Sequence, residues 1–410
     1  MNRRFVNLVA ANSESRIYSL HRLDVAKHLF YPSTAEAQAV GNIDEINNGG
    51  GGGGGKGSKD KPPRIERLRR LPAPSTHFHQ FPMVGNQRWP SWDDRFMLLG
   101  PRSSEGRILH VGVDGHALLY DADTCSTSTM PSLARSMVAR KQPHIFISIA
   151  AAAGPGEEES EGLYVMTGDY RSYSFELLDL SRPRQWQPLP PPPFPDFSLS
   201  SHVTSFTVVD GGRTICISFG GIYVDGGNTY CFDTASREWR KAGDWRLPFD
   251  DGAEYVLELN TWIGFSPFEP HRLCASDLSA MDAHQAPTLQ HVWEELRPPK
   301  EERSIVLNKR YPSILPSVVL ERRRYWLPLS QYMVNLGSGR FCIARVFLAE
   351  QSESLGHQHE TMPEGHVAVF TGVEIVRNDD NGEGGLRMVK HKSTHYKFSG
   401  YGICEPKWVL

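Results

Sequence analysis

Short runs of alternating apolar and polar residues recur along the chain and predict pairs of β-strands. In the clearest copy, residues 214–249, apolar side chains at 215, 217 and 219 alternate with small or polar ones. This period of two is typical of a half-buried strand. The sequence Asp-Gly-Gly-Asn at 225–228 tolerates the positive φ that a hairpin turn requires. A second alternating run follows and ends at Asp233, so the segment predicts a hairpin closed by an aspartate.

Five other segments repeat this order of strand, turn, strand ending in Asp, polar stretch often with Trp, and an exit with Pro. They cover residues 5–24, 107–133, 162–194, 261–298 and, more weakly, 341–375. Most of the intervals between successive copies are near the ~40–50 residues of a propeller blade. The strand-ending aspartates are Asp24, Asp121, Asp179, Asp233 and Asp277.

One such unit cannot bury both of its faces, whereas units stacked around an axis can, and a closed ring leaves only short edges. The repeats therefore predict an all-β fold: a single β-propeller of about six four-stranded, kelch-like blades. An array of immunoglobulin-like sandwiches is the alternative, but it would not carry the repeated order of Asp, Trp and Pro.

A low-complexity segment interrupts the repeats near the N-terminus. Seven consecutive glycines occupy residues 49–55 and have no means of packing. We therefore expect a first-blade hairpin over residues 1–46, a disordered Gly-rich and basic insert over 47–70, and the remaining blades of the same propeller over 71–410.

Composition and charge indicate which class of partner the chain binds and in which cellular compartment it resides. The chain has 410 residues, 44 Lys and Arg, 47 Asp and Glu, and a net charge of −3, which disfavours a nucleic-acid binder. No stretch has the ~20 apolar residues of a membrane helix, and residues 5–11 are too short a run for a signal peptide. Four of the six cysteines lie in apolar runs, where a reduced cysteine packs as a small hydrophobic residue. We therefore predict a cytoplasmic or nuclear protein that is not secreted. These four are Cys216, Cys231, Cys274 and Cys342.

Two motifs resemble ligand sites, but their context argues against both. Residues 50–57 nearly match a phosphate-binding loop, yet Gly57 replaces the required hydroxyl and two prolines follow where a helix should begin. His357, His359 and Glu364 have the spacing of a cupin metal site, but they lie in a polar run that predicts a loop over 351–364. We therefore predict no cofactor, no metal and no catalytic residue.

A basic segment follows the glycines and has two interpretations. It is a solvated loop, or a nuclear import patch or phosphate-contacting arm. Ile65, Leu68 and Leu71 give it a short helical rhythm. Its basic residues are Lys56, Lys59, Lys61, Arg64, Arg67, Arg69 and Arg70.

One run of prolines lies at the exit of a repeat, and three tryptophans recur at equivalent places in the repeats. The segment Pro190, Pro191, Pro192, Pro193 and Phe194 predicts polyproline II, which if exposed would suit an aromatic groove on a partner. Its position at a repeat exit also fits a connector between blades. The tryptophans occupy the same place in each repeat, which favours packing between blades over ligand contact. They are Trp186, Trp239 and Trp293.

Several longer stretches resemble a plant family expanded in grasses. They include RRFVNLV, IYSLHRLDVAKHLFYPSTAEA, WQPLPPPPF, TYCFDTASREWRKAGDWRLPF, LCASDLSAM, QHVWEEL and NLGSGRFCIARVF, and the resemblance runs from Arg3 to about Val376. Members are known as the domain of unknown function numbered 1618 or as kelch-like proteins. The resemblance implies a galactose-oxidase-type β-propeller and no activity. The double glycine of kelch repeats is not clean here, and no F-box precedes the first strand.

These observations predict a non-catalytic scaffold that holds an unknown protein partner through loops at one mouth of the ring. The alternative is an enzyme or small-molecule binder with its site in the central channel, where several blades bring polar groups together. A third option is a nuclear factor that acts through the basic segment.

Overall fold

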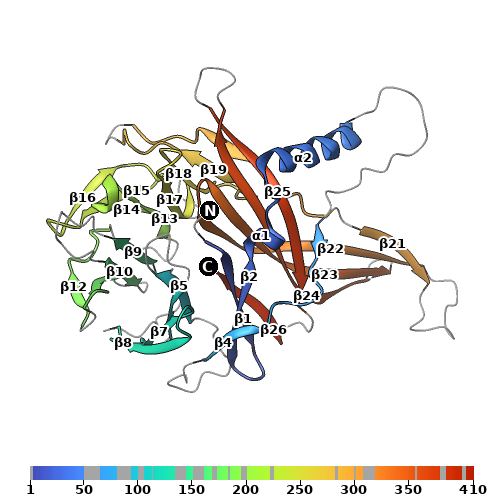
Figure 1. Ribbon diagram of the computed structural model, residues 1–410, viewed down its shortest axis with the longest axis horizontal. Coiled ribbons are helices and arrows are strands. Elements are labelled where there is room, and N and C mark those ends of the chain that lie inside the picture. The colour runs from blue at the N-terminus through green and yellow to red at the C-terminus, as the bar shows by residue number, and fades with distance from the viewer. Residues whose placement is uncertain are drawn as a thin grey trace. The chain divides into compact units, whose positions relative to one another are not determined.

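The computed structural model shows an all-β chain with few helices (Figure 1). By contacts it divides into two compact units. Unit 1 comprises residues 1–79, 295–376 and 387–410, and unit 2 comprises residues 80–294 and 377–386. No described helix is long and apolar enough to cross a membrane. The structure describes residues 3–49, 65–80, 94–99, 106–112, 114–133, 145–150, 161–168, 173–182, 185–194, 201–221, 226–281, 285–299, 302–307, 319–355, 358–378, 385–398 and 403–410.

Unit 2 contains four successive antiparallel meanders of four strands each. The third and fourth join into one eight-stranded sheet because their first strands pair in parallel, with Ser205 opposite Asp251. The first meander is β5 (Arg95–Leu99), β6 (Arg107–Val111), β7 (Ala117–Asp121) and β8 (Ser126–Met130). The second is β9 (Ile145–Ala150), β10 (Glu161–Gly168), β11 (Tyr173–Asp179) and β12 (Gln187–Leu189). The third is β13 (Ser201–Val209), β14 (Thr214–Gly221), β15 (Asn228–Asp233) and β16 (Glu238–Gly243), with the 3-10 turn η1 (Asp210–Gly212) after β13. The fourth is β17 (Asp250–Val256), β18 (Thr261–Phe265), β19 (Leu273–Ser276) and β20 (His291–Trp293).

Apolar clusters join each meander to the next one. Leu109 of the first meander packs in one cluster with Val165 of the second, and Phe175 of the second packs with Phe232 of the third. A third cluster includes Cys231 and Trp262, from the third and fourth meanders. Face-to-face packing of consecutive four-stranded meanders is the arrangement of neighbouring blades in a β-propeller.

Unit 1 contains two sheets that share one apolar core. Leu8 of the first sheet packs in the same cluster as Phe370 of the second. The C-terminal strand pairs antiparallel with the N-terminal strand, so both ends of the chain contribute to the first sheet. That sheet has the order β26 (Cys404–Val409), β1 (Phe5–Asn12), β2 (Ile17–Asp24) and β4 (Pro74–His79). The second has the order β21 (Glu302–Leu307), β22 (Val319–Gly337), β23 (Arg340–Leu355), β24 (Gln358–Arg377), β25 (Leu386–Lys397) and β3 (Glu66–Arg67).

The all-β prediction is confirmed, and each of the six predicted copies lies in its own meander or sheet. The single propeller of six four-stranded blades is not confirmed. The last copy belongs to a six-stranded sheet whose β24 alone has 20 residues, far longer than a blade strand needs. The chain also divides into two units where one ring was expected over residues 71–410. Closure into a ring stays a prediction.

Two of the recurring tryptophans form a hydrogen bond to the preceding meander. Trp186 donates its indole N–H to the carbonyl of Pro131 at 3.0 Å, and Trp239 donates to the carbonyl of Pro190 at 2.8 Å. Each acceptor is the proline at the exit of the preceding meander. The repeated Trp and Pro therefore act together between neighbouring sheets, which confirms the packing interpretation for these two tryptophans.

We expect Trp239→Phe to lower the free energy of unfolding by about 1 kcal/mol, because it removes this hydrogen bond and keeps most of the aromatic packing. The measurement is the urea midpoint of unfolding. Trp293→Phe is the matched control, since the described contacts of Trp293 are a ring stacking with His291 at 5.5 Å. Equal midpoints for Trp239→Phe and the wild type would contradict the bond's role.

The N-terminal hairpin continues into helices that the sequence analysis did not predict. Asp24 accepts a hydrogen bond from the amide of Lys27 at 3.0 Å and caps α1 (Val25–His28). The hydroxyl of Ser33 accepts one from the amide of Glu36 at 3.2 Å and caps α2 (Thr34–Gly49). Serine at the cap with glutamate three residues later is a known helix start. The predicted hairpin over residues 1–46 is therefore a hairpin followed by two helices.

The predicted insert and one predicted loop also differ from the structure. Both ends of the insert predicted over 47–70 belong to regular elements. Residues 47–49 are part of α2, and Glu66 of β3 pairs in parallel with Thr394 of β25. Ile65 and Leu68 pack against apolar clusters on either side of this short strand. The polar run at 351–364 lies in the long β23–β24 ribbon, because the antiparallel pairing continues to Leu355 opposite Gln358.

A buried polar network holds Tyr31, between the two helices, and Thr34, at the start of α2, to the second sheet of unit 1. Thr34 donates a hydrogen bond to Glu374 at 2.7 Å, and Arg340 donates one at 3.1 Å. His391 lies 3.2 Å from the same carboxylate and accepts the amide of Tyr31 through Nδ1 at 3.3 Å. The imidazole must therefore be neutral, with its proton on Nε2 facing Glu374. Burial alone would raise the pKa of Glu374, but hydrogen bonds from Thr34 and Arg340 lower it below its ordinary value.

Unit 1 should lose stability as the pH falls below about 6.5, the ordinary pKa of histidine. Burial lowers the pKa of five of its histidines in the folded state. The unfolded chain therefore binds more protons below 6.5, and the free energy of unfolding decreases on acidification. The urea midpoint at a series of pH values tests this, and His391→Gln should weaken the dependence. A midpoint that stays constant or rises down to pH ~5.5 would contradict it. The five histidines are His21, His28, His366, His391 and His395.

Candidate functional site

The repeated aspartates of unit 2 lie at one edge of the meanders, where each third strand ends. Asp233 accepts the amides of Ala235 and Ser236, both at 2.9 Å, and so closes the turn to the fourth strand. Asp121 closes the equivalent turn of the first meander through the amides of Asp123 and Thr124. Asp179 and Asp277 each accept one amide at 2.9 Å. We call this edge, defined by Asp121, Asp179, Asp233 and Asp277, the aspartate edge.

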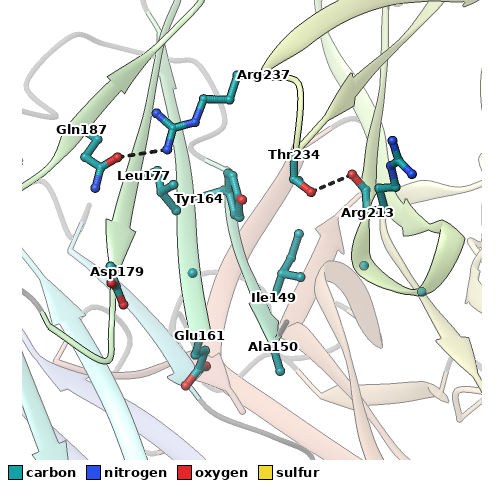
Figure 2. A pocket seen from close by; sticks show the side chains of 13 residues that line it. Ile149, Ala150, Glu161, Tyr164, Leu177, Asp179, Gln187, Arg213, Thr234 and Arg237 are labelled. Atoms are coloured by element: carbon teal, nitrogen blue, oxygen red, sulfur yellow. Dashed lines mark hydrogen bonds between the residues drawn. The ribbon is translucent and has the colours of Figure 1, made fainter. Parts of the chain in front are cut away.

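A pocket of about 410 Å³ opens between the second and third meanders at the aspartate edge (Figure 2). Figure 2 shows Tyr164 near its centre, the two arginines on the side of the third meander, and Glu161 with Asp179 on the second. Its apolar lining comes from Ile149, Ala150, Leu177 and the ring of Tyr164; its polar lining comes from Glu161, Asp179, Gln187, Arg213, Thr234, Arg237 and the backbone of Gly162, Gly211 and Gly212.

Polar contacts link the meanders around this pocket. Arg107 of the first meander donates to Glu161 of the second at 3.1 Å, and Ser148 also donates to Glu161. Arg237 of the third meander donates to the amide oxygen of Gln187 of the second at 3.2 Å. These contacts show that the aspartate edges of the three meanders lie together.

The turn η1 forms one wall of the pocket because its glycines adopt positive φ. Gly211 has φ +64° and Gly212 has φ +102°. A Cβ on Gly212 would lie 3.0 Å from the side chain of Ile149, so the turn packs directly against β9 of the second meander. The carbonyl of Arg213, which follows the turn, accepts the hydroxyl of Thr234 at 2.8 Å. The turn is therefore tied to the aspartate turn of the same meander.

Tyr164 is the aromatic residue that lines the pocket, and 8% of its surface is exposed. Burial raises the pKa of its hydroxyl, and the nearby charge of Arg237 and a hydrogen bond with Thr234 act in the opposite direction. The phenol is therefore protonated at neutral pH and is not set up to act as a base.

A second, smaller pocket of about 180 Å³ also opens at the aspartate edge, beside the fourth meander. Asn260 and Thr261 from the first turn of that meander line it together with Asp277. Arg377 closes one side and donates to the carbonyl of Leu259 at 3.1 Å. Both pockets described here therefore belong to the same edge of unit 2.

The predicted partner segment, Pro190–Phe194, does not line either pocket. Strand β12 leaves the aspartate edge, so the prolines that follow it lead away from that edge. Phe194 is half-buried and stacks on Phe219 at 4.5 Å, within the cluster between the second and third meanders. Pro190, Pro191 and Pro193 are exposed, and Pro192 is buried. Binding of a partner here stays a prediction, but Phe194 is already engaged in the core.

The predicted basic segment is described only in part. Lys56, Lys59, Lys61 and Arg64 lie outside the described residues, as does the near-match to a phosphate loop at 50–57. Arg67, Arg69 and Arg70 are exposed and belong to unit 1. The import function stays a prediction.

Glu364, the carboxylate of the motif that resembles a metal site, lies among cationic side chains. Glu364 accepts the ammonium of Lys397 at 2.8 Å and lies 3.2 Å from the guanidinium of Arg324. These contacts lower the pKa of Glu364. His357 and the side chain of His359 lie outside what the structure describes. Among the described residues, no group of three or more His, Cys, Asp or Glu could hold a metal ion.

Sequence comparison identifies the family. The model of a family described as "Protein of unknown function (DUF1668)" matches residues 3–396. The chain belongs to the DUF1668 family. The resemblance to the family numbered 1618 and to kelch proteins is not confirmed, although the expectation of a family without assigned activity is. A search of curated proteins gives no match for this DUF1668 chain.

Solved structures resemble the DUF1668 chain only distantly. TolB from Acinetobacter baumannii has 9% identity and a TM-score of 0.35, with 87% of this chain and 65% of TolB covered, so the chain spans less than two thirds of TolB. The Dos1 propeller has 9% identity and a TM-score of 0.30, covering 63% of this chain and 65% of the other. Hydrazine synthase of Kuenenia stuttgartiensis has 9% identity, a TM-score of 0.29 and coverages of 66% and 74%. The description of the fold therefore rests on the sheets of the chain itself.

Proposed function

We propose that this DUF1668 protein is a non-catalytic scaffold that binds a protein partner at the aspartate edge of unit 2. The observation that carries the proposal is that both pockets open on this one edge and are lined by residues from its turns. The repeated Asp and Trp side chains are engaged in closing turns and joining meanders. The polar groups of the turns at 211–213, 234–237 and 259–261 line the two pockets, and we expect the partner to contact them.

The proposal includes a cytoplasmic or nuclear location. All six cysteines are free thiols, and the four that the sequence placed in apolar strands are buried there. Burial raises the pKa of Cys274 to about 12, so its thiol is inert. A reducing compartment suits a chain with this set of thiols.

Site-specific photo-crosslinking tests the scaffold. Ala235 is exposed in a turn of the aspartate edge, and Ser128 is exposed on the outer strand β8. We expect a photoreactive benzoylphenylalanine in place of Ala235 to crosslink one recurrent protein in cells that express the chain, and the same group in place of Ser128 not to. No crosslinked protein from position 235, or the same set from both positions, would refute the proposal.

The alternative is a small-molecule site, and one observation favours it. The larger pocket, at about 410 Å³, has the size of a ligand site. It lies between the second and third meanders, at their aspartate edge. Crosslinking from position 235 to no protein, together with a small molecule that co-purifies with the chain, would favour this alternative.

A further inference from the structure

The larger pocket is lined by two arginines whose guanidinium groups have N–H donors without a partner among the described residues. Arg213 donates its Nε to Asp233 at 3.1 Å, and its side chain is 65% exposed. Both terminal nitrogens of this guanidinium have no other partner among the described residues. Arg237 donates one terminal nitrogen to Gln187, whose amide carries no charge. The positive charge of Arg237 is therefore not compensated by the group it bonds.

The acidic side chains of the pocket already accept hydrogen bonds from neighbouring residues. Glu161 is 12% exposed and already accepts Arg107 and Ser148. Asp179 uses Oδ1 to accept the amide of Ser181 at 2.9 Å and so keeps one oxygen. Among the described residues, Arg213 is paired with Asp233, whereas Arg237 has no carboxylate partner, so the positive charge of Arg237 is the one left uncompensated. A guanidinium recognises carboxylate and phosphoryl oxygens through charge-assisted hydrogen bonds.

The floor between these groups is apolar. In Figure 2, Leu177 and the ring of Tyr164 lie below Arg237, and Ile149 lies below Thr234. The pocket is open along the edge, so an extended chain can cross it while one side chain enters. An apolar floor with cationic groups on one wall fits an aliphatic stem that ends in an anionic group.

We propose that this pocket binds an acidic side chain of an extended segment on the partner, with its anionic oxygens on Arg213 and Arg237. The inference rests on the proposed scaffold function and deepens it by naming the recognised chemistry. The anionic group is the carboxylate of a glutamate or the phosphoryl group of a phosphoserine, which share the same oxygens. Neighbouring apolar residues of the segment lie on the floor formed by Ile149 and Leu177.

Short capped peptides test the chemistry directly. The probes are Gly-Leu-Glu-Leu-Gly, the same peptide with Gln in place of Glu, and the same peptide with phosphoserine. The full chain, labelled with ¹⁵N at arginine, reports binding through the Nε–H signals of Arg213 and Arg237. We expect a saturable shift of both signals with the Glu peptide, and at least about tenfold weaker binding of the Gln peptide. Tighter binding of the phosphoserine peptide would assign the phosphoryl source, and tighter binding of the Glu peptide the carboxylate.

Variants of exposed arginines supply the control. Arg213→Gln and Arg237→Gln should each weaken the Glu peptide at least about fivefold, and Arg240→Gln on the same strand as Trp239 should leave it unchanged. Higher salt should weaken binding in the wild type, which checks the charge effect without any variant. Equal affinity for Glu and Gln peptides, no shift with any probe, or an equal loss in Arg240→Gln would overturn the inference.

The two proposals fail separately. Peptide binding that depends on Arg213 and Arg237, with no protein crosslinked from position 235, would keep the pocket chemistry and refute the scaffold. A protein crosslinked from position 235 equally well in Arg213→Gln and Arg237→Gln would keep the scaffold and refute the pocket chemistry.

Discussion

Replacing Gly372 by alanine is expected to destabilise unit 1 by at least about 3 kcal/mol, because strand β24 passes directly under the backbone of another segment. A Cβ at this position would lie 2.2 Å from the carbonyl oxygen of Leu29 and 2.9 Å from its carbonyl carbon. The same carbonyl accepts the amide of Lys392 at 3.0 Å, so it cannot move away without breaking that bond. Leu29 itself is fully buried in the core of unit 1.

Gly41→Ala is the matched control for this substitution. Gly41 lies in α2, and a Cβ there would meet nothing within 4 Å. Alanine should therefore raise helix stability, by up to about 1 kcal/mol. Urea unfolding of the two variants measures both effects. If Gly372→Ala unfolds at the wild-type midpoint, the close approach of Leu29 to β24 is wrong.

Glu374→Ala is expected to cost about 3–5 kcal/mol, because it leaves the guanidinium of Arg340 without its counter-charge and the buried Nε2–H of His391 without its acceptor. Arg340 and Glu374 have side chains that are 22% and 10% exposed, and the imidazole of His391 is fully buried. Removal of the carboxylate also takes away the acceptor of Thr34, at the start of α2. Among the described hydrogen bonds, those from Lys392 to the carbonyl of Leu29 and from Tyr31 to His391 would still join this segment to the sheet.

Two measurements separate this network from a general loss of packing. Amide exchange of residues in α1 and the start of α2 should speed up in Glu374→Ala more than exchange in β14 of unit 2. Asp244→Ala removes an exposed carboxylate that pairs with Lys241, where the Asp244 side chain is 84% exposed, and should unfold near the wild-type midpoint. Equal midpoints for the wild type and Glu374→Ala would show that the network contributes nothing.

The strands were predictable because their signals are local. Alternation at 215–219 and the aspartate at 233 describe a single hairpin, and the structure pairs Thr214 with Asp233 as that pattern requires. The recurrence of Trp239 in several repeats pointed to packing, and the indole does reach the preceding exit. Such features need only a few neighbouring residues to be recognised.

The missed elements fall into two kinds. Helix α2 had a local signal, the Ser33 and Glu36 capping pair, which the hairpin interpretation overrode. Strand β26 had none, since Cys404–Val409 is short and its partner lies at the other end of the chain. The sequence over 351–364 is mostly polar, so composition alone favoured a loop.

The candidate site was not predictable for a related reason. Its arginines, Arg213 and Arg237, follow turns in the third meander, whereas Glu161 and Asp179 belong to the second. Only the packing of two meanders brings them to one pocket. The glycines at 211–212 were visible in the sequence, but their role as a wall depends on Ile149, more than sixty residues away.

Pairing of β1 with β26 makes unit 1 discontinuous along the chain, whereas nearly all of unit 2 is one uninterrupted stretch. During synthesis, residues 80–294 can acquire their meanders while the ribosome is still translating. The first strand, β1, must wait for Cys404–Val409 to emerge before its sheet is complete. The edge of β1 that pairs with β26 therefore stays unpaired until residues 404–409 have been made, and a premature stop codon just before residue 404 would leave this edge open.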